Sequence, residues 1–201
     1  MVRNVARGFR PGSGMGEPPM KKIVLIYGCI SGVMIATLMS LSLVFSKRIG
    51  YGHSMLLGYT IMVASFLLVY FGVRSYRDTE GGGEISFGRA MAVGSLIMLI
   101  TCVFYVASWE VLYFNFMPHF MDDYGAHTLA KMQASGASQA AIAKQAAAFE
   151  RMNKMYQNVF YNSAMTFIEP LPVGVLMTGV SAVLLRRKNK SEASTSGVMA
   201  A

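Results

Sequence analysis

Two glutamates, Glu110 and Glu169, lie in or beside long apolar segments of this chain. At about 1.5 Å per helical residue, Glu110 lies about 31 Å from Arg89, and Glu169 lies about 26 Å from Arg186. Because a hydrocarbon core is about 30 Å thick, both carboxyl groups are expected near one membrane boundary, on consecutive antiparallel helices where they could face each other. A carboxylate at that depth must reach water, take up a proton or pair with a cation such as Arg151, Lys154 or a bound ion. The spacing therefore predicts either two interfacial glutamates or a candidate ion or proton site.

Two prolines, Pro170 and Pro172, directly follow Glu169 in the chain. Proline has no backbone N–H, so the carbonyl groups of Thr166 and Ile168 lose their helical donors. The fourth apolar segment is therefore expected to kink or restart beside the Glu169 carboxyl group.

Other arrangements that could do chemistry are weaker. A group of soft and imidazole ligands that would suit copper follows the third apolar segment: Met117, His119, Met121 and His127, with Met152 and Met155 further along. Seventeen methionines make apolar packing the better interpretation of this group. The three histidines, His53, His119 and His127, lie on the predicted outer side, away from Cys29 and Cys102 within apolar segments. No nucleophile or zinc motif occurs in the sequence. We expect no enzyme, metal or cofactor.

Four apolar segments, each about long enough to cross a bilayer, must position these residues. The predicted spans are residues 23–45, 55–73, 90–109 and 167–185. With 54% hydrophobic and 14% charged residues, the chain would leave too much apolar surface for a soluble protein of its size. The predicted fold class is an all-α membrane protein, a four-transmembrane-helix bundle with an outer helical hairpin between spans 3 and 4.

The hairpin is predicted over about residues 111–162. Residues after the third span extend it outward to a break at Pro118, and Ser135-Gly136 reverses the chain. An alanine-rich helix then runs from Ser138 to Asn162 and directly into the fourth span. The loop of residues 46–54 is expected to join the first two spans, and Ser86 to cap the third.

The domain prediction is a membrane domain over residues 20–188, flanked by disordered tails at 1–19 and 189–201. Met20, followed by two lysines and an apolar run, resembles an alternative translation start. Stripes of small residues predict close helix contacts, which we interpret as packing within one chain in preference to a dimer. The stripes are Gly28, Gly32, Ala36 and Ser40; Gly58, Ser65 and Gly72; and Gly174, Thr178 and Ala182.

The net charge of +8 comes from short basic clusters beside the apolar segments, for example Lys21-Lys22 and Arg186 to Lys188. Basic residues in such positions are typical of signals that set the orientation of the spans and of contacts with lipid headgroups. The distribution argues against nucleic-acid binding. Twelve of the eighteen basic residues lie on the side of the predicted spans that carries both termini, and six lie on the opposite side. Both termini are therefore expected in the cytoplasm of a bacterium, with the protein in its inner membrane.

An ordered set of short patterns resembles the bacterial domain of unknown function 4199 family, over roughly residues 20 to 190. The patterns are Gly58-Tyr59-Thr60, Phe71-Gly72-Val73, Tyr76-Arg77-Asp78, Ile85-Ser86-Phe87-Gly88-Arg89-Ala90, and Glu169-Pro170-x-Pro172-Val173-Gly174 before Arg186-Arg187-Lys188. The resemblance implies a four-span membrane protein with a long loop between spans 3 and 4, and no established activity. It singles out as structural or docking candidates Tyr59, Tyr76, Arg77, Asp78, Phe87, Pro170 and Pro172, together with Glu169.

Two functions follow as expectations. The first is a non-enzymatic structural or partner-binding membrane protein, whose outer hairpin contacts a protein partner or another copy. The second is a small oligomeric transporter or channel subunit that uses Glu110 and Glu169. Arg77 and Asp78 are expected either to anchor the second span or to dock a cytoplasmic partner.

Overall fold

The computed structural model describes residues 19–49 and 51–186, and these form helices and turns without any strand. The helices are α1 (Pro19–Ile49), α2 (Tyr51–Thr79), α3 (Phe87–Asn115), α4 (Phe120–Ala134), α5 (Gln139–Tyr156), α6 (Val159–Ile168) and α7 (Leu171–Leu185). The all-α prediction is therefore confirmed. The predicted tails, apart from residue 19, lie outside the described residues.

Four stretches are long and apolar enough to cross a membrane: Met20–Leu43, Leu56–Thr79, Phe87–Asn115 and Val159–Leu185. The fourth consists of α6 and α7 together, and it begins eight residues earlier than the sequence suggested. Large apolar side chains on these stretches point outward, among them Val103 at 59% and Leu184 at 66% exposure. Such a surface suits lipid. This is a multi-pass membrane protein with four spans, as predicted.

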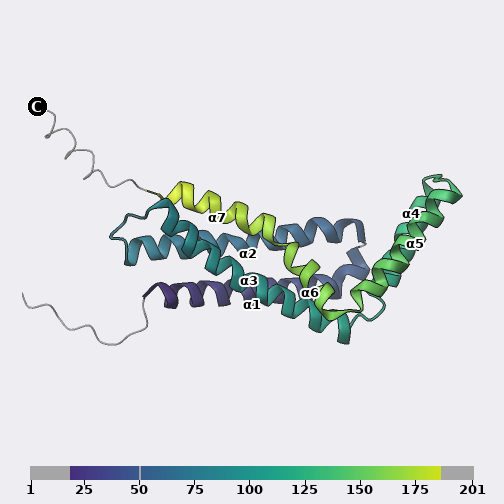
Figure 1. The fold of residues 1–201 in the computed structure, drawn as a ribbon, viewed down its shortest axis with the longest axis horizontal. Coiled ribbons are helices and arrows are strands. Elements are labelled where there is room, and N and C mark those ends of the chain that lie inside the picture. The colour runs from purple at the N-terminus through teal and green to yellow at the C-terminus, as the bar shows by residue number, and fades with distance from the viewer. Residues whose placement is uncertain (1–18, 50, 187–201) are drawn as a thin grey trace, which may run out of the picture.

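The four spans lie side by side in a bundle (Figure 1). One end of the bundle, called here the terminal end, holds the start of α1, the turn between α2 and α3, and the end of α7 (Figure 1). In that turn Gly82 and Gly83 have φ values of +58° and +90°, a conformation that glycine adopts without strain. Ser86 then caps α3 by accepting a 3.4 Å hydrogen bond from the Arg89 backbone N–H, as predicted.

Small residues let the helices approach closely inside the bundle. A Cβ added at Gly28 would lie 2.9 Å from Ile100 of α3, and one at Gly32 would overlap the ring of Phe104. The stripe on α1 therefore packs against α3, which confirms the prediction of packing within one chain at these positions. Gly58 differs, because a Cβ added there would meet none of the described residues within 4 Å apart from its own stretch of helix.

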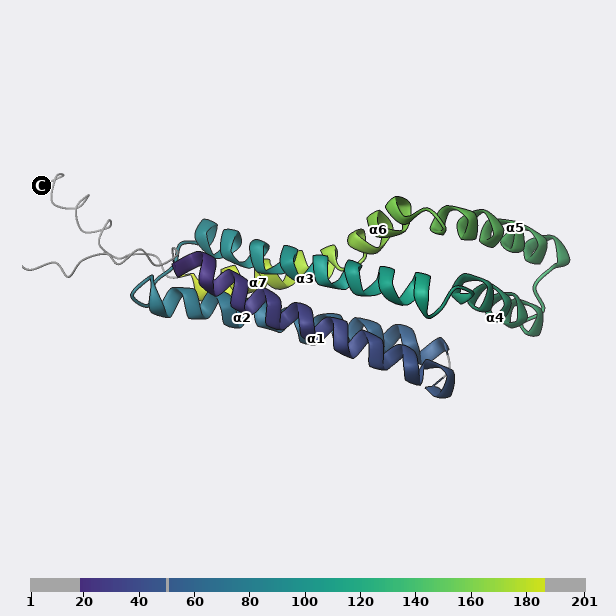
Figure 2. The same ribbon diagram turned by 90° about the horizontal axis from the view of Figure 1, so that it is seen from below.

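At the other end of the bundle, α4 and α5 form a hairpin that projects beyond the spans (Figures 1 and 2). Pro118 lies in the turn between α3 and α4, and Gly136 reverses the chain with φ of +77°, both as predicted. The predicted nine-residue loop between the first two spans is wrong, because α1 and α2 continue into it and only residue 50 separates them. We call this end the hairpin end.

The prediction that one helix runs from Ser138 into the fourth span is also wrong. The helix α5 ends at Tyr156, and Asn158 caps a new helix, α6, by accepting a 3.2 Å hydrogen bond from the Tyr161 backbone N–H. Asparagine is among the preferred residues at this position. The hairpin therefore joins the bundle through a break in the chain.

Candidate functional site

The fourth span is divided at Glu169. The helix α6 ends at Ile168 and α7 starts at Leu171, with Pro170 buried at the junction and Pro172 in the first turn of α7. Since neither proline can donate a backbone hydrogen bond, the helix cannot continue its regular pattern through this point. The prediction of a restart beside Glu169 is confirmed.

The Glu169 carboxyl group is bonded to α3. The Tyr105 hydroxyl donates a 2.9 Å hydrogen bond to Glu169 Oε2. Tyr105 is 7% exposed, whereas Glu169 lies at the surface of the protein. The phenol thus fixes one carboxylate oxygen at the helix junction while the residue stays accessible.

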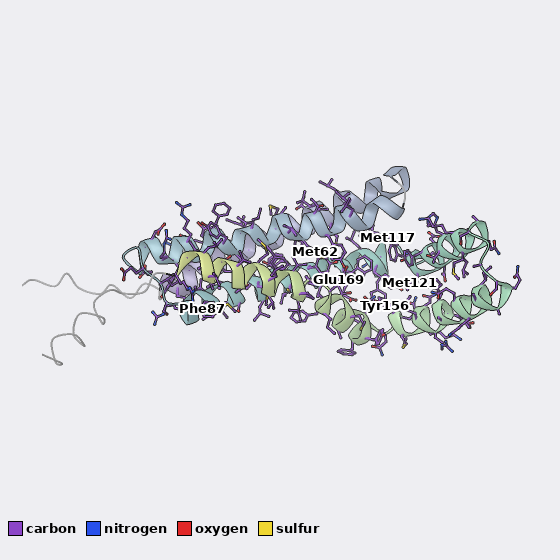
Figure 3. All side chains as sticks on the ribbon, turned by 90° about the horizontal axis from the view of Figure 1, so that it is seen from above. Met62, Phe87, Met117, Met121, Tyr156 and Glu169 are labelled. Carbon is purple, nitrogen blue, oxygen red and sulfur yellow. The ribbon has the colours of Figure 1, made fainter. Side chains whose placement is uncertain are left out.

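Tyr156, the last residue of α5, completes this region. Burial raises the pKa of Tyr156, and its neighbour Tyr161 and the Glu169 carboxylate raise it further. Figure 3 shows Glu169 at the junction of α6 and α7, and Tyr156 where α5 meets α6. The candidate site is therefore a carboxylate with nearby phenols, at the point where the split span meets the hairpin.

Glu110 lies elsewhere. Its Oε1 accepts a 3.0 Å hydrogen bond from the Ser163 hydroxyl of α6. On α3, Glu110 and Tyr105 are five residues apart, which places them about 140° apart around the helix axis. No hydrogen bond joins Glu110 to Glu169 in the described part of the chain, and each carboxyl group has its own partner.

A buried polar residue that sequence reasoning missed, Asn162, connects α3, α5 and α6. Its side-chain oxygen accepts hydrogen bonds of 2.9 Å from Trp109 Nε1 and 3.2 Å from the Thr166 hydroxyl. Its amide donates to the Tyr156 carbonyl oxygen at 3.3 Å. With no exposed surface, Asn162 holds the break between hairpin and span in place. Its only sequence signal is an amide inside an apolar run.

The candidate residues at the terminal end form a second, separate group. The Arg77 guanidinium contacts Asp78 at 2.7 Å, and Arg74 lies 3.7 Å from the same carboxylate. Arg89 Nη1 donates a 3.3 Å hydrogen bond to the hydroxyl of Tyr76, which is buried. The Arg89–Tyr76 bond ties the end of α2 to the start of α3, whereas the two ion pairs lie within α2.

Tyr59 and Phe87, the remaining residues of the family patterns, are exposed at 43% and 44%. Tyr59 lies near the hairpin end of α2 and Phe87 at the first residue of α3, so the two are on opposite halves of the bundle. Phe87 lies far from Glu169 along the bundle and does not share a site with it (Figure 3).

The methionine and histidine group lies at the base of the hairpin. Met121 is buried there, and Asp122 accepts a 2.6 Å hydrogen bond from Asn153 across the two helices. His119 Nδ1 lies 3.6 Å from Asp122. Among the side chains that the structure describes, those of residues 20–43 and 56–186, no three His, Cys, Asp or Glu gather as a metal site would require. The observed contacts pack α4 on α5.

Comparison with known protein families gives one match, over residues 26–187, to the DUF4199 family, which is described as a protein of unknown function. The chain belongs to the DUF4199 family. The match covers all four spans from early α1 to the end of α7, so the resemblance seen in the sequence is confirmed. No curated protein and no solved structure matched the chain.

Proposed function

We propose that this DUF4199 protein is a non-enzymatic protein of the bacterial inner membrane that binds a protein partner through the α4–α5 hairpin. One observation carries the proposal: none of the 18 residues of α5 is buried. Within the chain α5 packs on α4 and, near its end, on α6. Few contacts within the chain therefore stabilise α5. A surface that is kept for a partner would have this property.

The exposed face of α5 has the composition of a contact surface. Ala143, Ala147, Arg151 and Lys154 are exposed along it, and Met155 is 44% exposed. Small side chains allow close approach of another helix, and Arg151 offers a partner for an acidic group. Lys154 is paired with Glu150 of the same helix at 2.9 Å. Asn162 supports the same role because it fixes how the hairpin leaves the bundle.

The charge distribution supports an orientation with the hairpin outside the cell. Exposed basic residues, including Lys21, Lys22, Arg89 and Arg186, lie at the terminal end. Basic residues are retained on the cytoplasmic side of bacterial membranes. The proposed partner is therefore periplasmic, membrane-bound with an outward part, or a second copy of this chain.

Cross-linking from the hairpin in living cells tests the proposal. A photoreactive residue at Ala147, exposed on α5, is expected to give one discrete adduct, whereas the same residue at Val183, 52% exposed on α7, is expected to react with lipid only. An adduct that adds 21.9 kDa would identify a second copy. Absence of any protein adduct from several exposed α5 positions would refute partner binding.

A second candidate function is a small oligomeric transporter or channel subunit that responds to protons or cations. The split fourth span favours it, because broken helices with a carboxylate at the break resemble the ion sites of transporters. Glu169→Gln removes the charge and keeps the shape. If assembly or stability of the purified protein depends on pH or cations in the wild type and not in this variant, the second function gains support; identical behaviour would remove it.

A further inference from the structure

A groove of about 520 Å³ lies between α3 and α6, on the side of α3 that carries Glu110. Val103 and Ala107 of α3 line one wall, and Ala164 and Phe167 of α6 line the other. All these residues lie within the third and fourth membrane-spanning stretches, so the groove faces the bilayer when the protein is embedded. Its volume is within the range of small-molecule sites.

Glu110 supplies the acidic group of this apolar groove. Its carboxyl group lacks a full set of hydrogen-bond partners. Oε1 accepts the Ser163 hydrogen bond, whereas Oε2 is closed off from solvent and accepts none from the described residues. Among the described side chains of residues 20–43 and 56–186, the ion pairs involve Asp78, Asp122 and Glu150, and none supplies a cation to Glu110. An unpartnered carboxylate oxygen in an apolar setting is costly, so the site calls for a donor from outside the chain.

We propose that this groove binds a membrane lipid with a primary-ammonium headgroup, phosphatidylethanolamine, whose acyl chain lies along the apolar walls and whose ammonium group donates to Glu110. Charge complementarity selects this occupant, since the groove presents one carboxylate and no basic side chain in its lining. The terminal torsion of a glutamate is broad, so the carboxyl group can turn Oε2 toward the groove. Phosphatidylcholine carries the same chains and a positive charge, but its quaternary nitrogen has no N–H to donate.

Native mass spectrometry of the full-length protein in detergent tests the proposal. The protein is titrated with phosphatidylethanolamine, phosphatidylcholine and phosphatidylglycerol of identical acyl chains. Phosphatidylethanolamine is expected to bind about tenfold more tightly than phosphatidylcholine, as the loss of one charge-assisted hydrogen bond predicts. Glu110→Gln is expected to remove this preference, and Glu80→Gln, an exposed glutamate in the turn after α2, is expected to retain it.

A substitution that fills the groove provides an independent measurement. Val103→Trp is expected to weaken binding of both zwitterionic lipids without changing the thermal unfolding temperature, because Val103 is 59% exposed. Equal binding of phosphatidylethanolamine and phosphatidylcholine, an unchanged preference in Glu110→Gln, or stronger binding of phosphatidylglycerol would overturn the proposal. A dimer that carries no lipid at any lipid concentration would overturn it as well, since a second copy would then occupy the groove.

Discussion

The hydroxyl of Tyr105 donates a 2.9 Å hydrogen bond to Oε2 of Glu169, and so joins the middle of α3 to the division of the fourth span. The two residues are 64 positions apart in the sequence. Because prolines follow Glu169 directly, the backbone there lacks regular helical hydrogen bonds. The Tyr105 contact therefore supplies a tertiary restraint where the local restraint is missing.

Removing this restraint should destabilise the protein. Tyr105→Phe is expected to lower the free energy of unfolding by about 1–3 kcal/mol, since a hydrogen bond to a charged group is lost and little volume changes. Thermal unfolding in detergent measures the effect. Tyr59→Phe is the control, because Tyr59 is 43% exposed, and its unfolding temperature should stay near that of the wild type. Equal effects in both variants would show that the Tyr105 bond contributes nothing specific.

Substitution of Asn162 should destabilise the protein more than substitution of any other asparagine at the hairpin end. Asn162→Ala leaves Trp109 Nε1 and the Thr166 hydroxyl without their acceptor, at a cost on the order of 3 kcal/mol. The matched control is Asn115→Ala, whose exposed amide bonds only to the Val111 carbonyl of its own helix. Denaturant or thermal unfolding of both variants compares them. A loss below about 0.5 kcal/mol in Asn162→Ala would contradict a structural role for the amide.

Close packing of α1 on α3 gives a third prediction. Gly32→Val should destabilise the bundle by about 1–3 kcal/mol, because the new side chain overlaps the Phe104 ring and forces the helices apart. Gly58→Val introduces the same side chain into α2, where an added Cβ meets none of the described residues within 4 Å apart from its own stretch of helix. Expression level and thermal stability should fall in the first variant alone. A similar loss at Gly58 would mean that helix propensity, not packing, decides the result.

Part of the loss of stability at alkaline pH should come from Tyr156. Its folded-state pKa is raised above the unfolded value of 10.0, so the folded protein retains a proton that the unfolded chain has already lost. Stability from this group is present below pH 10 and is lost as the pH rises through the folded pKa. Tyr156→Phe should therefore flatten the fall in unfolding temperature above that pH, whereas Tyr124→Phe, whose ring contacts are kept, should not. Parallel curves for all three proteins would refute the assignment.

Sequence patterns predicted the elements whose causes are local. Long apolar runs determine the spans, Ser86 and Pro118 act on their own neighbours, and Gly136 permits the reversal of the hairpin. The break at Asn158 also has a local signal, an asparagine before a new apolar run, but the strong helix propensity of the alanine-rich segment concealed it.

The tertiary features could not be predicted in the same way. Depth along a span follows from counting residues, and this placed Glu110 and Glu169 near one boundary. The direction in which each carboxyl group points depends on helix rotation and on the kink in the fourth span. As a result, Glu110 is hydrogen-bonded to Ser163, and Glu169 is hydrogen-bonded to Tyr105. The role of Asn162 likewise exists only once three helices meet.

Cysteine labelling in intact cells tests whether the α4–α5 hairpin is presented outside the membrane, on the side opposite the α2–α3 turn. With Cys29 and Cys102 replaced by alanine, single cysteines are placed at Ser135 and Glu84, which are exposed and avoid the positive-φ glycines beside them. A membrane-impermeant maleimide is expected to label Ser135→Cys in intact cells and Glu84→Cys only after the membrane is opened. Labelling of both positions in intact cells, or of Glu84→Cys alone, would contradict it.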